Sequence, residues 1–211
     1  MRPLLATGFS LVMLLSMPVI SQADSVEILF QQGNAAHELG DYVEAEAAYR
    51  EALRLAPDDA DAYYNLGNAL IDQGRDEEAE ASYREALRLD PNDASTYLNL
   101  GVTLSNQDRY EETEALYREA LRLDPDYAAA YNNLGYLYQV QNRLEEATDQ
   151  YQQALSIAPD YTPVQNNLAE AKRLLSLQTS PLPTHSDDLA WQPRNEPLQP
   201  VLRSVVRIVT K

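Results

Sequence analysis

Apolar positions recur along the chain with the spacing of amphipathic helices that come in pairs. In the segment 60–93, one helical face carries a first apolar group, Ala62, Leu66, Ala69 and Leu70. After Gly74 the helical spacing resumes with a second apolar group, Ala79, Tyr83, Ala86 and Leu87. Spacings of three and four residues are typical of a helix with one buried face. The pattern predicts two helices joined by a tight turn.

The same pair of helices is encoded four times at a period of 34 residues. Counting from proline to proline gives repeats at 26–59, 60–93, 94–127 and 128–161. Four residue types keep the same phase: Gly33, Gly67, Gly101 and Gly135; Tyr49, Tyr83, Tyr117 and Tyr151; Ala52, Ala86, Ala120 and Ala154; and Pro57, Pro91, Pro125 and Pro159. A fixed period of this kind indicates structural units that stack on copies of themselves.

Special backbone residues mark where each helix ends and where two helices meet. The turn between the paired helices carries Gly40, Gly74, Asp108 or Asn142, residue types that tolerate a left-handed backbone. The glycine row lies inside the first helices, where glycine costs about 1 kcal/mol relative to alanine. We therefore predict a close helix approach at the glycines, opposite the small residues of the phase-matched row, Ala52, Ala86, Ala120 and Ala154.

The motif Tyr63-x-x-Leu66-Gly67, followed by Ala79, Tyr83, Ala86 and Pro91, resembles the tetratricopeptide repeat family. The first repeat departs from the motif, with Leu29 and Gln32 in place of the aromatic residue and the leucine. The resemblance implies an all-α, right-handed solenoid of four helical hairpins over residues 24–177, with 162–177 as a capping helix. Pairs four residues apart on the second helices, Glu46 with Arg50, Glu80 with Arg84 and Glu114 with Arg118, are interpreted as a solvated face.

The resemblance also implies that the first helices line a concave groove. By phase, the predicted peptide-binding residues are Asn34, Asn65, Asn68, Asn99, Asn133, Asn167, Tyr64, Leu98, Val102 and Tyr136. Carboxamides can donate to and accept from an extended peptide backbone. Two alternatives stay open: the asparagines bond a neighbouring helix, or the apolar residues pack between repeats. The Lys and Arg clamp that some family members use for a peptide carboxylate has no match here, which disfavours a chaperone-tail ligand.

Both ends of the chain differ in composition from the repeats. Residues 1–23 begin with Met1-Arg2, continue with a mostly apolar stretch over 4–20 and end at Ala23, which is the layout of a secretory signal peptide. An uncleaved anchor is the alternative. Residues 178–211 combine a proline-rich linker, expected to be extended or disordered, with a short apolar tail. Within that tail, residues 203–208 are similar to the first strand of trypsin-like peptidases, so a truncated peptidase is an alternative reading.

Charge and chemistry narrow the function classes. The net charge of −17 disfavours nucleic acid and favours a basic protein or peptide as partner. The absence of cysteine excludes disulfides and thiolate catalysis. Residues 185–188, His-Ser-Asp-Asp, are too local to build a triad, and the aspartates at 58–61 lack the rest of a calcium loop. We expect no enzyme activity, metal or cofactor, but an exported, periplasmic or extracellular scaffold that binds protein segments. Self-assembly end to end is a third reading.

Overall fold

The computed structural model describes residues 21–179, and this part of the chain consists of nine α-helices without a β-strand. Their bounds are α1 Gln22–Glu38, α2 Tyr42–Leu55, α3 Ala60–Asp72, α4 Asp76–Leu89, α5 Ala94–Asn106, α6 Tyr110–Leu123, α7 Ala128–Val140, α8 Leu144–Ile157 and α9 Thr162–Thr179. Each predicted repeat is a hairpin, and α9 follows as the cap. The all-α solenoid that the resemblance to tetratricopeptide repeats implies is confirmed.

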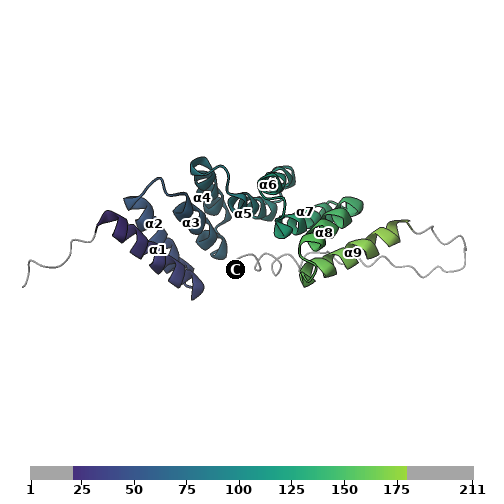
Figure 1. The fold of residues 1–211 in the computed structure, drawn as a ribbon, viewed down its shortest axis with the longest axis horizontal. Helices are drawn as coiled ribbons and strands as arrows, with labels where there is room; N and C mark the ends of the chain where they lie inside the picture. Colours follow the sequence, from purple (N-terminus) through teal and green to yellow (C-terminus); the bar gives the residue numbers. More distant parts are fainter. Residues whose placement is uncertain (1–20, 180–211) are drawn as a thin grey trace, which may run out of the picture.

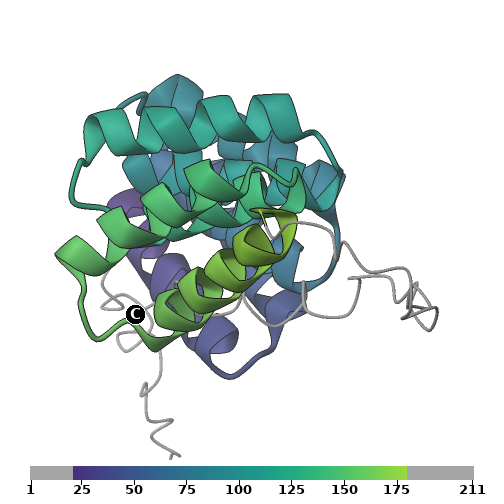
Figure 2. The same ribbon diagram turned by 90° about the vertical axis from the view of Figure 1, so that its right-hand side faces the viewer.

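The hairpins follow one another along an arch from α1 to α9 (Figure 1). Viewed along the arch, α9 lies nearest and the purple α1 lies at the far end (Figure 2). Each helix contacts its neighbours in sequence, and the odd-numbered helices of successive hairpins also contact one another, α3 with α5, α5 with α7 and α7 with α9. Because they approach each other most closely, these first helices line the inside of the curve.

Capping and turn residues explain where the helices begin and end. Ser21 and Asp24 form a reciprocal capping box at the start of α1, and Asp59 accepts a hydrogen bond from the Ala62 amide at the start of α3. The hairpin turns place Gly40, Gly74, Asp108 and Asn142 in the left-handed region, with φ of 79°, 75°, 59° and 60°. The prediction that this turn position requires a left-handed backbone, whether it holds Gly, Asp or Asn, is confirmed.

The glycine row lies against tyrosine rings, which corrects the predicted contact with the alanine row. A Cβ added to Gly67 would lie 2.5 Å from Tyr83 Cε1, and one added to Gly33 would lie 2.5 Å from Tyr49 Cε1. The tyrosine and the alanine three residues later share one face of the second helix, so spacing could not choose between them. The large ring fills the space that the missing Cβ leaves.

One carboxylate on each of α2, α4 and α6 lies largely buried at the junction with the next repeat, which corrects the prediction of a solvated face. We call Glu46, Glu80 and Glu114 the junction carboxylates; Glu46 and Glu80 are only 9% and 8% exposed. Each accepts a hydrogen bond from an arginine in the turn of the next hairpin. Glu46 accepts from Arg75 at 2.5 Å, Glu80 from Arg109 at 2.7 Å and Glu114 from Arg143 at 2.9 Å. The predicted pairs four residues apart also form.

Charge-assisted hydrogen bonds lower the pKa of two junction carboxylates, Glu46 and Glu114. Burial alone would raise the pKa of Glu114, but hydrogen bonds from Arg143 and Tyr138 outweigh it, so that the pKa is lowered. The pKa of Glu46 is lowered in the same way, by Gln73, Arg75 and Arg50 against the effect of burial. These ionised carboxylates therefore join successive repeats with a bond of fixed direction, from one hairpin to the one before it.

Several predictions concern residues 1–20 and 180–211 and so lie outside the described residues. They are the apolar part of the signal peptide, most of the linker, the His185 cluster and the peptidase-like segment. Within the described part, α1 already includes Gln22 and Ala23, which were assigned to the leader. No helix between residues 21 and 179 combines the length and the apolar character needed to span a membrane.

The glycine–tyrosine contact gives a matched pair of substitutions. Gly67→Ala should destabilise the protein by roughly 1–3 kcal/mol, because the Tyr83 ring is buried and cannot move away from the new methyl group. Gly74→Asn should change stability by less than about 0.5 kcal/mol, because Asn142 occupies the same left-handed position in the fourth repeat. Urea unfolding curves of the two variants measure the difference, and equal midpoints would contradict the packing described.

Candidate functional site

The predicted groove residues lie on the odd-numbered helices. Asn34 belongs to α1; Tyr64, Asn65 and Asn68 to α3; Leu98, Asn99 and Val102 to α5; Asn133 and Tyr136 to α7; and Asn167 to α9. Apart from Leu98 and the exposed Asn34, these side chains are half-buried. The helices therefore bring the predicted asparagines to one curved surface, and the contacts of each side chain decide its role.

Two of the asparagines bond the tyrosines that pack on the glycines. Tyr49 donates its hydroxyl to Asn34 Oδ1 at 2.8 Å, and Tyr83 donates to Asn68 Oδ1 at 2.7 Å. Burial raises the pKa of Tyr49 to about 12, so this hydroxyl stays a donor. Asn34 and Asn68 thus receive the buried tyrosine hydroxyls of their own hairpins, and their Oδ1 atoms are already engaged.

A second set of bonds ties α5 to α3. Asn99 Nδ2 donates to Asn68 Oδ1 at 3.0 Å and to the Tyr64 hydroxyl at 3.2 Å. Tyr64 also packs beside Tyr83, with ring centroids 6.1 Å apart. For Asn99 the alternative of bonding a neighbouring helix is therefore what the structure shows, and this amide helps to fix the curvature between repeats two and three.

The last asparagines form a similar link between α7 and the cap. Asn167 Nδ2 donates to Asn132 Oδ1 at 3.0 Å, and Asn132 Nδ2 donates to Asn133 Oδ1 at 3.3 Å. Asn132 is 2% exposed. Sequence reasoning missed it as an anchor. The available signal was a polar residue at the position that holds Phe30, Tyr64 and Leu98 in the other repeats.

Leu98 is a correction to the predicted site, because its side chain is fully buried. It packs in the core cluster with Tyr117 and Ala130, between the third and fourth hairpins, and cannot meet a ligand. Val102 packs partly against the same cluster. Tyr64 and Tyr136 keep partly exposed rings at the groove. The packing alternative therefore holds for Leu98 and in part for Val102 and Tyr64.

Some amide groups of the row have no partner within residues 21–179. Asn65 bonds only its own helix, through Nδ2 to the Asp61 carbonyl at 2.9 Å, and its Oδ1 makes no hydrogen bond in this part of the chain. Asn133 Nδ2 and Asn167 Oδ1 likewise make no hydrogen bond in this part of the chain, whereas the other amide atom of each side chain is bonded. Asn65, Asn133 and Asn167 therefore offer two acceptors and one donor, and the other amide atom of each is held in place.

The charged residues of the groove belong to its first half. Glu27 and Glu38 on α1 and Asp61 and Asp72 on α3 occupy groove positions, whereas the corresponding positions of α5 and α7 hold Ser95, Asn106, Ala129 and Val140. Burial raises the pKa of Asp61, and repulsion from Asp59, Asp93 and Asp90 raises it further. This half of the groove favours positive charge.

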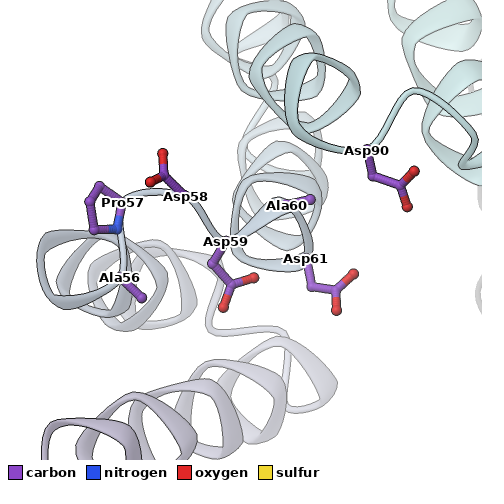
Figure 3. A pocket seen from close by; sticks show the side chains of 7 residues that line it. All are labelled: Ala56, Pro57, Asp58, Asp59, Ala60, Asp61 and Asp90. Atoms are coloured by element: carbon purple, nitrogen blue, oxygen red, sulfur yellow. The ribbon is translucent and has the colours of Figure 1, made fainter.

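Asp61 also belongs to a pocket beside the groove, at the junction of the first two repeats. The pocket is lined by residues 56–61 and Asp90, and the carboxylates of Asp59, Asp61 and Asp90 point to the same side of the loop (Figure 3). Within the described residues, no group of three or more His, Cys, Asp or Glu side chains is arranged to hold a metal ion.

His37 is the histidine that the structure describes, and it lies between repeats. Its Nε2 is 2.9 Å from Asp72 Oδ2 on α3, and its ring meets Tyr42 edge to face at 5.3 Å. The pair connects α1 with the following hairpin. Although it is close to Asp72, the buried Nε2 makes no hydrogen bond of good geometry within residues 21–179.

Paired helices of 34-residue period, a glycine–tyrosine contact in each hairpin and a groove lined by the first helices define a tetratricopeptide-repeat protein. The chain belongs to the family described as the cilia and flagella-associated protein 70 C-terminal domain, whose model matches residues 20–174. No curated protein matches the chain.

Solved structures share this fold. The MamA protein is 24% identical, with a TM-score of 0.66 over 74% of this chain and 85% of that one. YrrB, a tetratricopeptide-repeat protein with an unusual peptide-binding site, is 25% identical, with a TM-score of 0.61 over 70% and 74%. The first repeat domain of Spaghetti (RPAP3), bound to the HSP90 peptide SRMEEVD, is 24% identical, with a TM-score of 0.54 over 56% and 95%.

The two kinds of asparagine can be separated by substitution. Asn68→Ala should destabilise the protein by about 1–3 kcal/mol, because the buried Tyr83 hydroxyl and Asn99 Nδ2 both lose their acceptor. Asn65→Ala removes one bond within its own helix and should change stability by less than about 0.5 kcal/mol. Chemical unfolding monitored by circular dichroism tests this order, and a neutral Asn68→Ala variant would refute the anchoring role.

Proposed function

We propose that this protein is a scaffold that binds an extended protein segment in its concave groove. The observation that carries the proposal is the row of half-engaged amides, Asn65, Asn133 and Asn167, on the first helices. Held side chains with one unused donor or acceptor can bond a peptide backbone at a low cost in side-chain entropy. The peptide-binding site of YrrB is a precedent within the same fold.

The charge of the groove favours a segment with basic residues toward its first half. Four carboxylates occupy groove positions on α1 and α3. The HSP90 peptide bound to Spaghetti has two Glu and one Asp against one Arg, and such a ligand would be repelled here. The proposed partner therefore carries Lys or Arg opposite α1 and α3.

The second half of the groove supports contact with apolar residues. Tyr136 is half-buried, and Val140 at the end of α7 is 45% exposed although it is a large apolar residue. Single exposed apolar side chains are ordinary on protein surfaces, but here they extend a line of amides in the same groove. The proposed ligand is thus amphipathic along its length, basic at one end and apolar at the other.

The arrangement supports a binding role without chemistry of its own. Repeat domains of this class are generally non-catalytic, and the described groove presents amides, carboxylates and tyrosines. The protein would act by bringing its ligand to other molecules. This conclusion concerns the repeat domain, residues 21–179.

We further propose that the chain is exported, which the composition of residues 1–23 supports. Cleavage after Ala23 would remove Ser21, the capping residue of α1, together with the first two helical residues. The mature domain would then begin at Asp24 with a frayed first turn, a modest loss in a helix of 17 residues.

The binding proposal can be tested with a displayed library of short peptides. The full chain should enrich peptides that contain Lys or Arg, and the double variant Glu27→Gln, Asp61→Asn should lose that enrichment by about tenfold. The control variant Glu77→Gln, Glu111→Gln removes two exposed carboxylates from the second helices and should behave like the original chain. Enrichment that survives in the groove variant, or no enrichment at all, would contradict the proposal.

Export is tested by expression in a bacterium that has an inner and an outer membrane. Sequencing of the recovered protein should give Asp24 as the first residue, and the protein should leave the cytoplasm with the periplasmic or extracellular fraction. A chain that retains Met1 and stays in the cytoplasm would refute export but would leave the groove proposal intact.

A further inference from the structure

The open N-terminal end of the solenoid exposes residues that every later repeat buries. Ile28 on α1 is 42% exposed, whereas the equivalent residues Ala62, Thr96, Ala130 and Val164 are at most 1% exposed. Those residues are buried because each packs on the hairpin before it. In the first repeat no described hairpin precedes α1, and a branched apolar side chain faces outward instead.

Leu39 and Val43 extend the same surface around the first turn. Leu39 is 86% exposed and takes the place of Gln73 and Gln107, which bond the junction carboxylate of the preceding repeat. Val43 is 67% exposed, at the position where later repeats hold Glu77, Glu111 and Glu145. We call Ile28, Leu39 and Val43 the N-terminal face. Ile28 and Leu39 stand where packing or junction contacts form in later repeats, and Val43 places an apolar side chain where later repeats hold exposed glutamates. Together they indicate a surface that another element covers.

The opposite end carries the other two large exposed apolar residues of the described chain, Val140 and Leu177, at 45% and 62%. Gln178 Nε2 donates to Asn142 Oδ1 at 2.8 Å, which places the last turn of α9 beside the turn that follows α7. Leu177 stands at the position of the junction arginines. Val140 belongs to the groove, and we call Lys172, Arg173 and Leu177 the C-terminal face.

The charges of the two faces are opposite. The first helix carries Asp24, Glu27 and Glu38, and no Lys or Arg occurs from residue 21 until Arg50. The cap α9 carries Lys172 and Arg173 against the single acid Glu170. Arg173 pairs with Glu170, while Lys172 is exposed and is the single lysine of residues 21–179. Two N-terminal faces would repel each other, whereas an N-terminal face and a C-terminal face attract.

We propose that the N-terminal face binds the C-terminal face of a second copy of this chain. The contact joins two different surfaces, so it is heterologous, and repeated addition produces an open chain of molecules unless the rotation closes a ring. The groove remains on the inside of each copy, and assembly presents several grooves in a row. The inference is independent of what the groove binds.

The experiment compares the full chain with one variant of each face by sedimentation velocity over a wide concentration range. The original chain should show a weight-average mass that rises about twofold or more with concentration, as mass action requires for a weak contact. Leu39→Glu in the N-terminal face should abolish that rise. The double variant Lys172→Glu, Leu177→Glu in the C-terminal face should abolish it as well. Ala81→Glu, an exposed position on α4, is the matched control and should assemble like the original.

Mixing the two variants distinguishes the proposed contact from other arrangements. The N-terminal variant keeps an intact C-terminal face, and the C-terminal variant keeps an intact N-terminal face. An equimolar mixture should therefore form dimers and nothing larger. Self-association of the C-terminal variant alone would show a contact between two N-terminal faces and overturn the proposal. If the mass of the original chain does not change with concentration, the proposal is also overturned. That result would mean that the N-terminal face stays uncovered or is covered by another part of the same molecule. Unchanged melting curves confirm that each variant is folded.

Discussion

The contact of a buried tyrosine ring with a glycine backbone sets the distance between the two helices of every hairpin. Tyr83 fills the space beside Gly67 so closely that one methyl group would collide with the ring. The hydroxyl at the end of the same ring reaches Asn68 on the groove surface. One side chain therefore fixes the hairpin and, through its polar end, positions a residue of the groove surface. Stability and groove geometry depend on the same contact.

The junctions between hairpins add a second constraint of a different kind. Each junction carboxylate is largely buried, and arginine side chains from two repeats surround it. Such an arrangement is sensitive to the loss of one partner, because the remaining charge would stay buried alone. The groove asparagines bridge the same junctions on the inner side, from α5 to α3 and from α9 to α7. The curvature of the groove is thus held from both sides, which suits a site that binds by preformed shape.

Much of the fold follows from the sequence, and the site follows only in part. The repeat period located the helices, and the alternation of Gly, Asp and Asn at one position identified the turns. The partner of the glycine row was wrong because Tyr83 and Ala86 share a helix face, and periodicity does not rank residues on one face. Leu98 was assigned to the groove because its helical phase matches Tyr64. Its side chain packs in the core between the third and fourth hairpins, and this depends on contacts between repeats that one repeat does not encode.

The asymmetry of the junctions has a consequence for how such a chain can change in length. Repeats two and three each contribute an arginine to the junction with the repeat before and a carboxylate to the junction with the repeat after. In repeat two these residues are Arg75 and Glu80, and in repeat three they are Arg109 and Glu114. Repeat one has Asp41 at the arginine position, and repeat four has Thr148 at the carboxylate position. An internal unit can therefore be duplicated or lost in the gene with every new junction complete, so the groove can grow or shrink in steps of 34 residues. The first and last units are not exchangeable in this way, and they act as the fixed ends of a structure whose middle is free to evolve in length.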